Sequence, residues 1–403
     1  MKKVLFGLTA LTLAMGSAQA AKLTVWTHYG TGELAWVNAA AKAFMATPAG
    51  KDNTIDVVVV PFGDIKQKMI QSKGEAADLV MSLPQDQIGE LITNGVLEPV
   101  DSLISSAAKS DLAASSQKAF TYNGKLFGFP VFNEAVAVVY NKKLLPEGIP
   151  KTWDAFISKA QQLTDAKQQK FGFLAEIENQ YNMHGLFYAM GGYVFKGYDK
   201  GAPNQKDVGL NNAGADKAGQ LINDLRYKYN LIPEGAADGG VISDLFYKGQ
   251  VAMWQTGPWN AEAIRKSGVD FGIGLLPKPT GATRNWAPFL GVQAIVMNSY
   301  SNQKKLAAEF ANYLVLPVNQ VAFSKAGGRI PASKAAAKQL ASDPVVAGFS
   351  KAAQVGVAMP NIAAMGQVWG PWGDAVTLIA KTKGANVSKL LDDAVKQINA
   401  NIK

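Results

Sequence analysis

Tryptophan gathers at two Gly-Pro turns of the sequence. The chain holds 8 Trp, and four of them fall in two short stretches, Trp254 and Trp259 within Val251–Asn260, and Trp369 and Trp372 within Val368–Trp372. Flat rings beside such turns suit a site that stacks on the apolar faces of sugar rings. Any one of these rings, taken alone, is more often core packing. Two Gly-Pro-Trp units, each beside a second Trp, favour a binding site.

The sequence carries little that predicts catalysis, a metal or a cofactor. His28 and His184 are the only histidines and cysteine is absent, so a zinc site is not expected. We find no Gly-x-Ser-x-Gly elbow, Walker loop or dinucleotide-binding glycine motif. A glycoside hydrolase would need two carboxylates about 5–10 Å apart. Glu134 with Asp86 or Glu178 could supply them, so a hydrolase remains the alternative from another class.

The element that positions Trp259 reads as a strand followed by a helix. Val251–Thr256 is apolar and strand-like, Gly257 provides the turn, and Pro258 suits the first turn of a helix because its missing N–H has no partner there. Trp259 is therefore expected just past the carboxyl end of a strand. Ligands bind at that edge in open α/β sheets.

The first hundred residues alternate between strand and helix patterns. Lys22–Thr27, Ile55–Val60 and Asp78–Ser82 read as strands, and a helix pattern follows each of them. The near-continuous apolar run of the second strand is typical of a parallel sheet covered on both faces. Asp64 is expected to cap the helix that follows that strand. This order predicts one doubly wound α/β lobe.

An acidic residue interrupts a long apolar strand in the middle of the chain. Val131–Tyr140 reads as a strand that is broken only by Asn133-Glu134. A buried acid needs a specific reason. The strand could cross between two lobes with Glu134 at an exposed crossing, and we favour the related interpretation in which Glu134 faces a cleft there.

Length, charge and the N-terminus limit the class of protein. With 403 residues the chain is too long for one ordinary core, so two lobes are expected. Lys2-Lys3, an apolar run and a small-residue cleavage pattern predict a signal peptide over residues 1–20. Without a cysteine for lipid attachment, we expect a soluble periplasmic protein. The net charge of +9 comes from scattered lysines, so no nucleic-acid partner is expected.

Taken together, these segments resemble the maltose/maltodextrin-binding proteins, which are extracellular solute-binding proteins of ABC transporters. The resemblance covers nearly the whole chain after the signal peptide. It is carried by the order and spacing of Leu23–Trp26, Tyr122–Lys125, Glu134–Asn141, Leu144–Pro146, Lys151–Trp153, Gly191–Lys196, Asp207–Gly209, Asn212–Gly214, Lys248–Trp259 and Met359–Ile362.

The resemblance implies an α/β fold of the two-lobe periplasmic-binding-protein type, class II, with a ligand cleft between the lobes and three hinge crossings. The first lobe is expected to comprise residues 21–132 and 278–330, and the second lobe residues 133–277 and 331–403. The crossings are expected near Phe132–Val136, Leu275–Lys278 and Gly328–Ala332.

The resemblance also implies binding residues on or near the second lobe. Trp259 and Trp369 match the family's sugar-stacking positions, Tyr181 lies close to its stacking Tyr, and Glu134 matches an acceptor for sugar hydroxyls. Trp372 is expected to add to this aromatic surface.

The first-lobe half departs from the family pattern. The expected charged pair is replaced by Gly30-Thr31, a Trp by Ser82, and an Asp-Arg pair by Gln85-Asp86. His28, Gln85 and Asp86 are expected to offer different hydrogen bonds at these places.

The resemblance implies a monomer that binds maltose or maltodextrin by aromatic stacking and hinge closure and then docks on the membrane permease subunits of an ABC importer. No enzymatic activity and no cofactor are expected. Another ligand, such as trehalose, a different oligosaccharide or a polyol, stays open.

Overall fold

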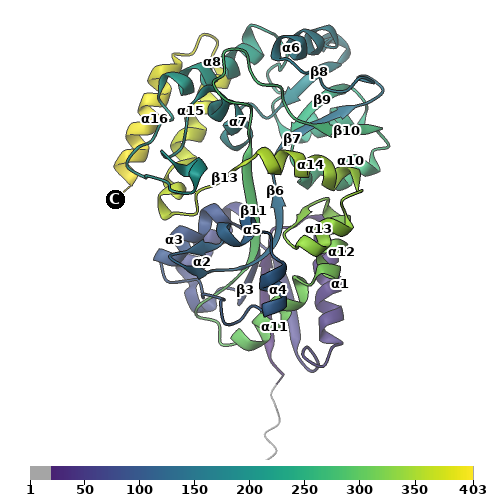
Figure 1. The fold of residues 1–403 in the computed structure, drawn as a ribbon, viewed down its shortest axis with the longest axis vertical. Helices are drawn as coiled ribbons and strands as arrows, with labels where there is room; N and C mark the ends of the chain where they lie inside the picture. Colours follow the sequence, from purple (N-terminus) through teal and green to yellow (C-terminus); the bar gives the residue numbers. More distant parts are fainter. Residues whose placement is uncertain (1–19, 403) are drawn as a thin grey trace, which may run out of the picture.

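The computed structural model describes residues 20–402, which form two α/β lobes joined at a narrow waist (Figure 1). The predicted signal peptide lies, except for Ala20, outside the described residues. Each lobe is built on its own β-sheet, and strands β6 and β11 run through the waist. The two-lobe α/β fold expected from the sequence is confirmed.

The first lobe contains a sheet with the strand order β12-β6-β11-β3-β1-β2. Strand β1 pairs in parallel with β2 and β3, whereas β11 is antiparallel to β3 and β6. The strands are β1 (Lys22–Thr27), β2 (Thr54–Val59), β3 (Leu79–Pro84), β6 (Phe129–Glu134), β11 (Phe289–Met297) and β12 (Ile330–Pro331). The helices are α1 (Thr31–Met45), α2 (Phe62–Ser72), α3 (Ile88–Thr93), α4 (Ser106–Asp111), α5 (Ala114–Ala119), α11 (Lys304–Leu314), α12 (Pro317–Gly327) and α13 (Lys334–Gln339).

The second lobe contains a sheet with the strand order β10-β7-β9-β8. Its strands are β7 (Ala137–Asn141), β8 (Phe171–Ala175), β9 (Val251–Thr256) and β10 (Phe271–Gly274). The helices are α6 (Trp153–Gln162), α7 (Gln180–Met190), α8 (Ala213–Tyr227), α9 (Gly239–Tyr247), α10 (Ala261–Lys266), α14 (Pro344–Val355), α15 (Trp369–Lys381) and α16 (Val387–Asn401). A short strand, β13 (Val357–Ala358), pairs with the start of β11 and so links this part of the chain to the first sheet.

The hydrophobic cores show where the chain crosses between lobes. Phe132 belongs to the first-lobe core and Ala135 to the second, so the chain passes from one core to the other between these residues. The second crossing differs from the expected 277/278 boundary. Trp286 and Phe289 pack in the second-lobe core, and only Val292 returns to the first. The crossing therefore lies within β11. The chain after Pro277 continues to pack against the second lobe, although the preceding segment ends at that proline.

The third crossing is also later than expected. Ile330 packs in the second-lobe core, but Ala332 returns to the first. Helix α13 then packs against α12 and β12, so it stays with the first lobe although the sequence placed residues 331–403 in the second. Its Ala336 and Leu340 pack with Val321 of α12 and also with Val346 of α14.

The short-range sequence patterns agree with the structure at a hairpin turn but not at the start of helix α2. Asn123 and Gly124 both have positive φ and join β4 (Thr121–Tyr122) to β5 (Lys125–Leu126), as an Asn-Gly hairpin requires. Asp64 is not a cap, because α2 begins earlier, after Pro61. Pro371 lies in the first turn of α15, where a proline is tolerated because the N–H groups of that turn have no partner within the helix.

No helix among residues 20–402 is both long and apolar enough to span a membrane.

Candidate functional site

Two adjoining cavities lie between the lobes. One of about 440 Å³ is lined by Trp259, and one of about 450 Å³ is lined by Trp369; we call them the Trp259 cavity and the Trp369 cavity. Phe62, Glu134 and Gln293 line both, so the two form one continuous cleft. Each volume falls in the range of ordinary small-molecule sites.

Trp259 reaches the cleft from the turn that follows β9. Gly257 is extended, Pro258 begins a short 3₁₀ helix (Pro258–Asn260), and α10 follows, so the expected strand-turn-helix order is confirmed. The indole folds back on its own turn: a Cβ on Gly257 would lie 2.1 Å from ring atom Cζ3. Its exposed fraction of 36% is high for Trp, so one ring face remains open to a ligand.

Trp369 is held more firmly than Trp259. Its Nε1–H donates to Oδ2 of Asp86 in the first lobe at 2.9 Å. Its ring is stacked on Trp372 with centroids 6.2 Å apart, and it meets Phe289 edge-on at 5.9 Å. The Trp369 side chain therefore has a fixed orientation and still lines its cavity.

Tyr181 lies between the two tryptophans. It occupies the first turn of α7, which Asn179 caps, and its ring is 6.2 Å from that of Trp259 and 6.1 Å from that of Phe289. Its hydroxyl is buried and has no hydrogen-bond partner within the described chain. A buried hydroxyl left unpaired is costly, so a ligand hydroxyl is a suitable partner for it.

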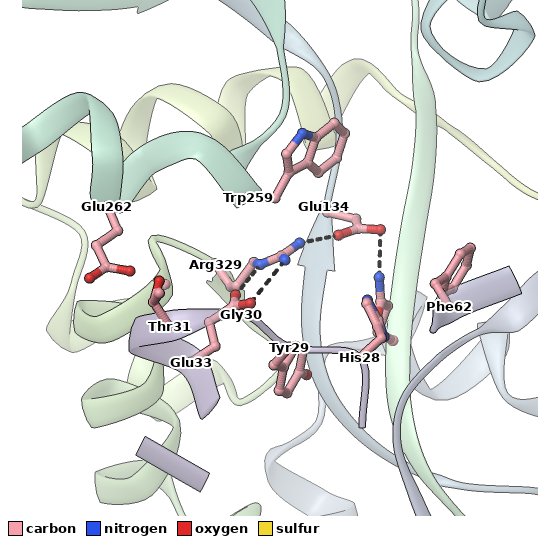
Figure 2. A pocket seen from close by; sticks show the side chains of 12 residues that line it. His28, Tyr29, Gly30, Thr31, Glu33, Phe62, Glu134, Trp259, Glu262 and Arg329 are labelled. Atoms are coloured by element: carbon pink, nitrogen blue, oxygen red, sulfur yellow. Dashed lines mark hydrogen bonds and ion pairs between the residues drawn. The ribbon is translucent and has the colours of Figure 1, made fainter. Parts of the chain in front are cut away.

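A buried ion-pair network forms the floor of the Trp259 cavity (Figure 2). The Arg329 guanidinium donates to Glu134 Oε2 at 2.5 Å and to Glu33 Oε1 at 2.6 Å. Gln293 Nε2 donates to the other Glu134 oxygen at 2.8 Å. Because Glu134, Gln293 and Arg329 come from β6, β11 and the segment between α12 and β12, this network joins the first two crossings to that segment.

The network determines which of its groups stay charged. Burial raises the pKa of Glu134, while Arg329 opposes that rise. Burial acts to lower the pKa of Arg329, but Glu33 and Glu134 raise it above its usual range. Arg329 thus stays protonated and supplies the positive charge that both carboxylates need.

His28 and Asp86 occupy opposite cavities and have opposite pKa shifts. Burial, followed by the Arg329 charge, lowers the pKa of His28 to about 4. Burial raises the pKa of Asp86 to about 6, against the hydrogen bond from Trp369. His28 Nδ1 lies 2.9 Å from Ser82 Oγ and its ring packs on Phe62, so a neutral imidazole lines the cavity.

Comparison with known proteins places this chain in a family. The sequence profile of the bacterial extracellular solute-binding proteins matches residues 39–348. The chain belongs to this family.

The chain is similar to both solved and curated solute-binding proteins. The Thermus thermophilus maltotriose-binding protein, solved with maltotriose, is 46% identical with a TM-score of 0.89, over 94% of this chain and 100% of that one. The galactooligosaccharide-binding protein of Bacillus subtilis is 29% identical over 97% of this chain and 91% of its own length. A maltooligosaccharide ABC transporter solute-binding lipoprotein of Streptococcus pneumoniae is 30% identical over 95% and 90%.

The structure brings six of the eight expected site residues to the cleft of this solute-binding protein. They are His28, Asp86, Glu134, Tyr181, Trp259 and Trp369. Whether each one contacts a ligand stays a prediction.

Two expected site residues are corrected. Trp372 has no exposed surface and packs edge-on against Phe187 and Phe289, so its ring supports Trp369 from behind. Gln85 is also fully buried, and its amide bonds the backbone of β11 at Leu290 and Val292. Both side chains are buried in contacts within the protein, and neither lines the cleft.

Sequence reasoning missed Arg329, Gln293, Phe62 and Glu262. Arg329 had a usable signal, since it is a lone charge in the Gly-rich linker that was expected to be a crossing. Phe62 also had one, as an aromatic just after the Pro61 that follows an apolar strand; that strand, β2, lies at the sheet edge and is largely half-buried, although a strand covered on both faces was expected. Gln293 and Glu262 carry no comparable signal, because each depends on how the lobes face each other. Among residues 20–402 no group of three His, Asp or Glu side chains could hold a metal ion.

Proposed function

We propose that this solute-binding protein captures malto-oligosaccharides for an ABC importer. The observation that carries the proposal is the pairing of Trp259 and Trp369 along one cleft, with carboxylates between and beside them. Sugar rings have apolar C–H faces and polar edges, so they match a surface of this kind. The maltotriose-binding relative from Thermus thermophilus supports the choice of ligand.

Binding would combine stacking with hydrogen bonds to charged acceptors. Trp259, Trp369 and Tyr181 would face the sugar rings, each contact contributing about 1 kcal/mol beyond area burial. Glu134 and Asp86 would accept from hydroxyls, and a charged acceptor bonds more strongly than a neutral one. Because the cleft residues come from both lobes, the ligand would favour the closed state, in which it touches both.

The protein would act outside the cytoplasm and transform nothing chemically. The Lys2–Ala20 pattern supports secretion to the periplasm. After closure, the protein would dock as a monomer on the permease subunits of its transporter. The Streptococcus pneumoniae relative, a component of an ABC transporter, supports this partnership.

A panel of sugars in a thermal-shift assay tests the proposal. A ligand at a hundred times its Kd stabilises a protein by about 2.7 kcal/mol. We expect maltotriose and maltotetraose to raise Tm clearly, and trehalose and polyols to have little effect. If no malto-oligosaccharide shifts Tm, the proposed ligand is wrong.

The second candidate is a receptor for another oligosaccharide. The galactooligosaccharide-binding relative and the altered first-lobe residues favour it over a receptor for trehalose or a polyol. The same panel separates the two candidates, because a galacto-oligosaccharide would then give the larger shift. Release of reducing sugar from maltodextrin by the purified protein would instead indicate a hydrolase.

A further inference from the structure

Gly32 and Glu262 meet across the cleft. Gly32 lies in the first turn of α1, and Glu262 lies on α10, three residues after Trp259. A Cβ on Gly32 would lie 2.3 Å from Glu262 Oε2 and 2.7 Å from Oε1. The backbone of Gly32 is not in the left-handed region, so the space for a side chain here is limited by the Glu262 carboxylate and not by backbone conformation.

The two residues belong to different lobes. Helix α1 packs in the first-lobe core through Val37, Ala41 and Phe44, whereas α10 packs in the second through Ala261 and Ile264. Any hinge opening that separates the lobes at this end of the cleft would pull Glu262 away from Gly32.

The local electrostatics favour the contact. Gly30 is the N-cap of α1 and offers no side-chain hydrogen bond to the first backbone N–H groups. These groups carry partial positive charge, which stabilises a nearby carboxylate. Glu262 brings one from the opposite lobe (Figure 2), while Lys266 holds the same carboxylate at 2.6 Å from the outer side.

We propose that Gly32 and Glu262 form the closing contact of the cleft at its Trp259 end and so set how tightly the lobes close on a sugar. Thr31 and Glu262 both line the Trp259 cavity, which places the contact at the edge of that cavity. The Asp86–Trp369 hydrogen bond is the corresponding cross-lobe contact in the other cavity. The proposal rests on the proposed sugar-binding function, and both residues act by positioning the lobes.

A methyl group on Gly32 tests the contact. Gly32→Ala would push Glu262 away and reduce the population of the fully closed state. Because apparent affinity falls with the binding-competent fraction, we expect maltotriose affinity to fall about tenfold by isothermal titration. Gly63→Ala is the matched control, since Gly63 occupies the same position of α2 and its Cβ would meet nothing within 4 Å.

A double variant separates a clash from an unrelated defect. In Gly32→Ala/Glu262→Ala the obstructing carboxylate is gone, so affinity should return to that of Glu262→Ala alone. If Gly32→Ala binds maltotriose as tightly as wild type, or if the double variant binds it more weakly than Glu262→Ala alone, the proposal is wrong.

A crosslinking test does not depend on the sugar. The chain has no cysteine, so an introduced pair has no competing thiol. The Gly32→Cys/Glu262→Cys variant should form a disulfide under mild oxidation. Gly32→Cys/Gly370→Cys should not, because nothing lies within 4 Å of a Cβ on Gly370.

The two tests distinguish the possible failures. A disulfide specific to the first pair, in a protein whose wild type does not bind maltotriose, would overturn the proposed ligand and leave the closing contact standing. Equal crosslinking of both pairs, or of neither, would overturn the closing contact.

Discussion

The two cavities of the cleft hold their aromatic rings in different ways. Trp259 stands 36% exposed on a turn, above the buried ion pairs of Arg329 with Glu33 and Glu134. Trp369 is hydrogen-bonded by the opposite lobe and backed by Trp372. The Trp259 half therefore combines an open ring with a rigid charged base, and the Trp369 half combines a fixed ring with a single buried acid.

Because of this difference, the residues that stabilise the fold and those expected to contact the ligand are separate in one half of the cleft and the same in the other. In the Trp259 half, we expect the folded state to depend on Arg329 and ligand binding to depend on the ring. In the Trp369 half, one side chain serves both purposes, because the ring that lines the cavity also packs in the core. Substitutions should therefore have separable effects in one half and coupled effects in the other.

The largest expected effect is the loss of Arg329. Arg329→Ala leaves Glu33 and Glu134 buried without a cation, and breaking such a network costs about 3–5 kcal/mol of unfolding free energy. Urea denaturation measures it. Arg265→Ala, which breaks a more exposed pair with Asp343, is the control and should cost about 1 kcal/mol. Equal losses of unfolding free energy for the two variants would mean that the buried Arg329 network contributes no more to stability than an exposed ion pair.

The two tryptophans should differ in their effect on stability. Trp369→Ala removes half-buried packing on Trp372 and Phe289 and leaves Asp86 without its donor, so we expect a loss of about 2–3 kcal/mol. Trp259→Ala removes a ring with little packing and should cost less than about 0.5 kcal/mol. Thermal unfolding of both variants without sugar makes the comparison, and similar losses would contradict it.

Asp86 should make the Trp369 half less stable as pH rises. Its folded pKa of about 6 exceeds the ordinary 3.8, so the folded protein holds the proton more tightly and stability is lost as pH rises through 6. Asp86→Asn does not titrate and can still accept from Trp369. We expect it to exceed wild type by about 2 kcal/mol at pH 8 and to match it near pH 4. A less stable variant at pH 8 would show that the charged hydrogen bond outweighs burial.

His28 should act in the opposite direction in the Trp259 half, with the smallest effect. Its pKa of about 4 lies below the ordinary 6.5, so its contribution is present above pH 6.5 and lost as pH falls toward 4. His28→Gln should lose about 1 kcal/mol less than wild type between pH 7 and pH 5. Chemical denaturation at both pH values measures this, and parallel losses would rule out a buried neutral imidazole.

Local sequence patterns predicted the elements well and the lobe boundaries less well. Strand β9, the turn at Gly257 and the first turn at Pro258 follow from backbone chemistry within ten residues, so Trp259 could be placed in advance. The second crossing could not be predicted, because contacts with residues distant in sequence determine that Trp286 and Phe289 pack in the second lobe. A proline marks where a strand ends and does not show which core the following side chains join.

Site residues could be predicted where the residue type and its local sequence are unusual. They could not be predicted where their position depends on contacts between the two lobes. Trp259 and Trp369 have a visible sequence context, and so does Glu134 inside an apolar strand. Trp372 shares that context but points inward, because it lies three residues after Trp369 on the same helix and packs beneath it. The roles we assign to Arg329 and Glu262 in the site depend on partners about 200 residues or more away along the chain.

Isothermal titration of maltotriose into wild type and Trp259→Ala tests the central claim most directly, because this substitution should leave the fold intact. We predict that the variant keeps its Tm without sugar and binds at least about tenfold more weakly, a loss of about 1.4 kcal/mol. Unchanged affinity in a variant with unchanged Tm would contradict the claim that this ring holds the sugar.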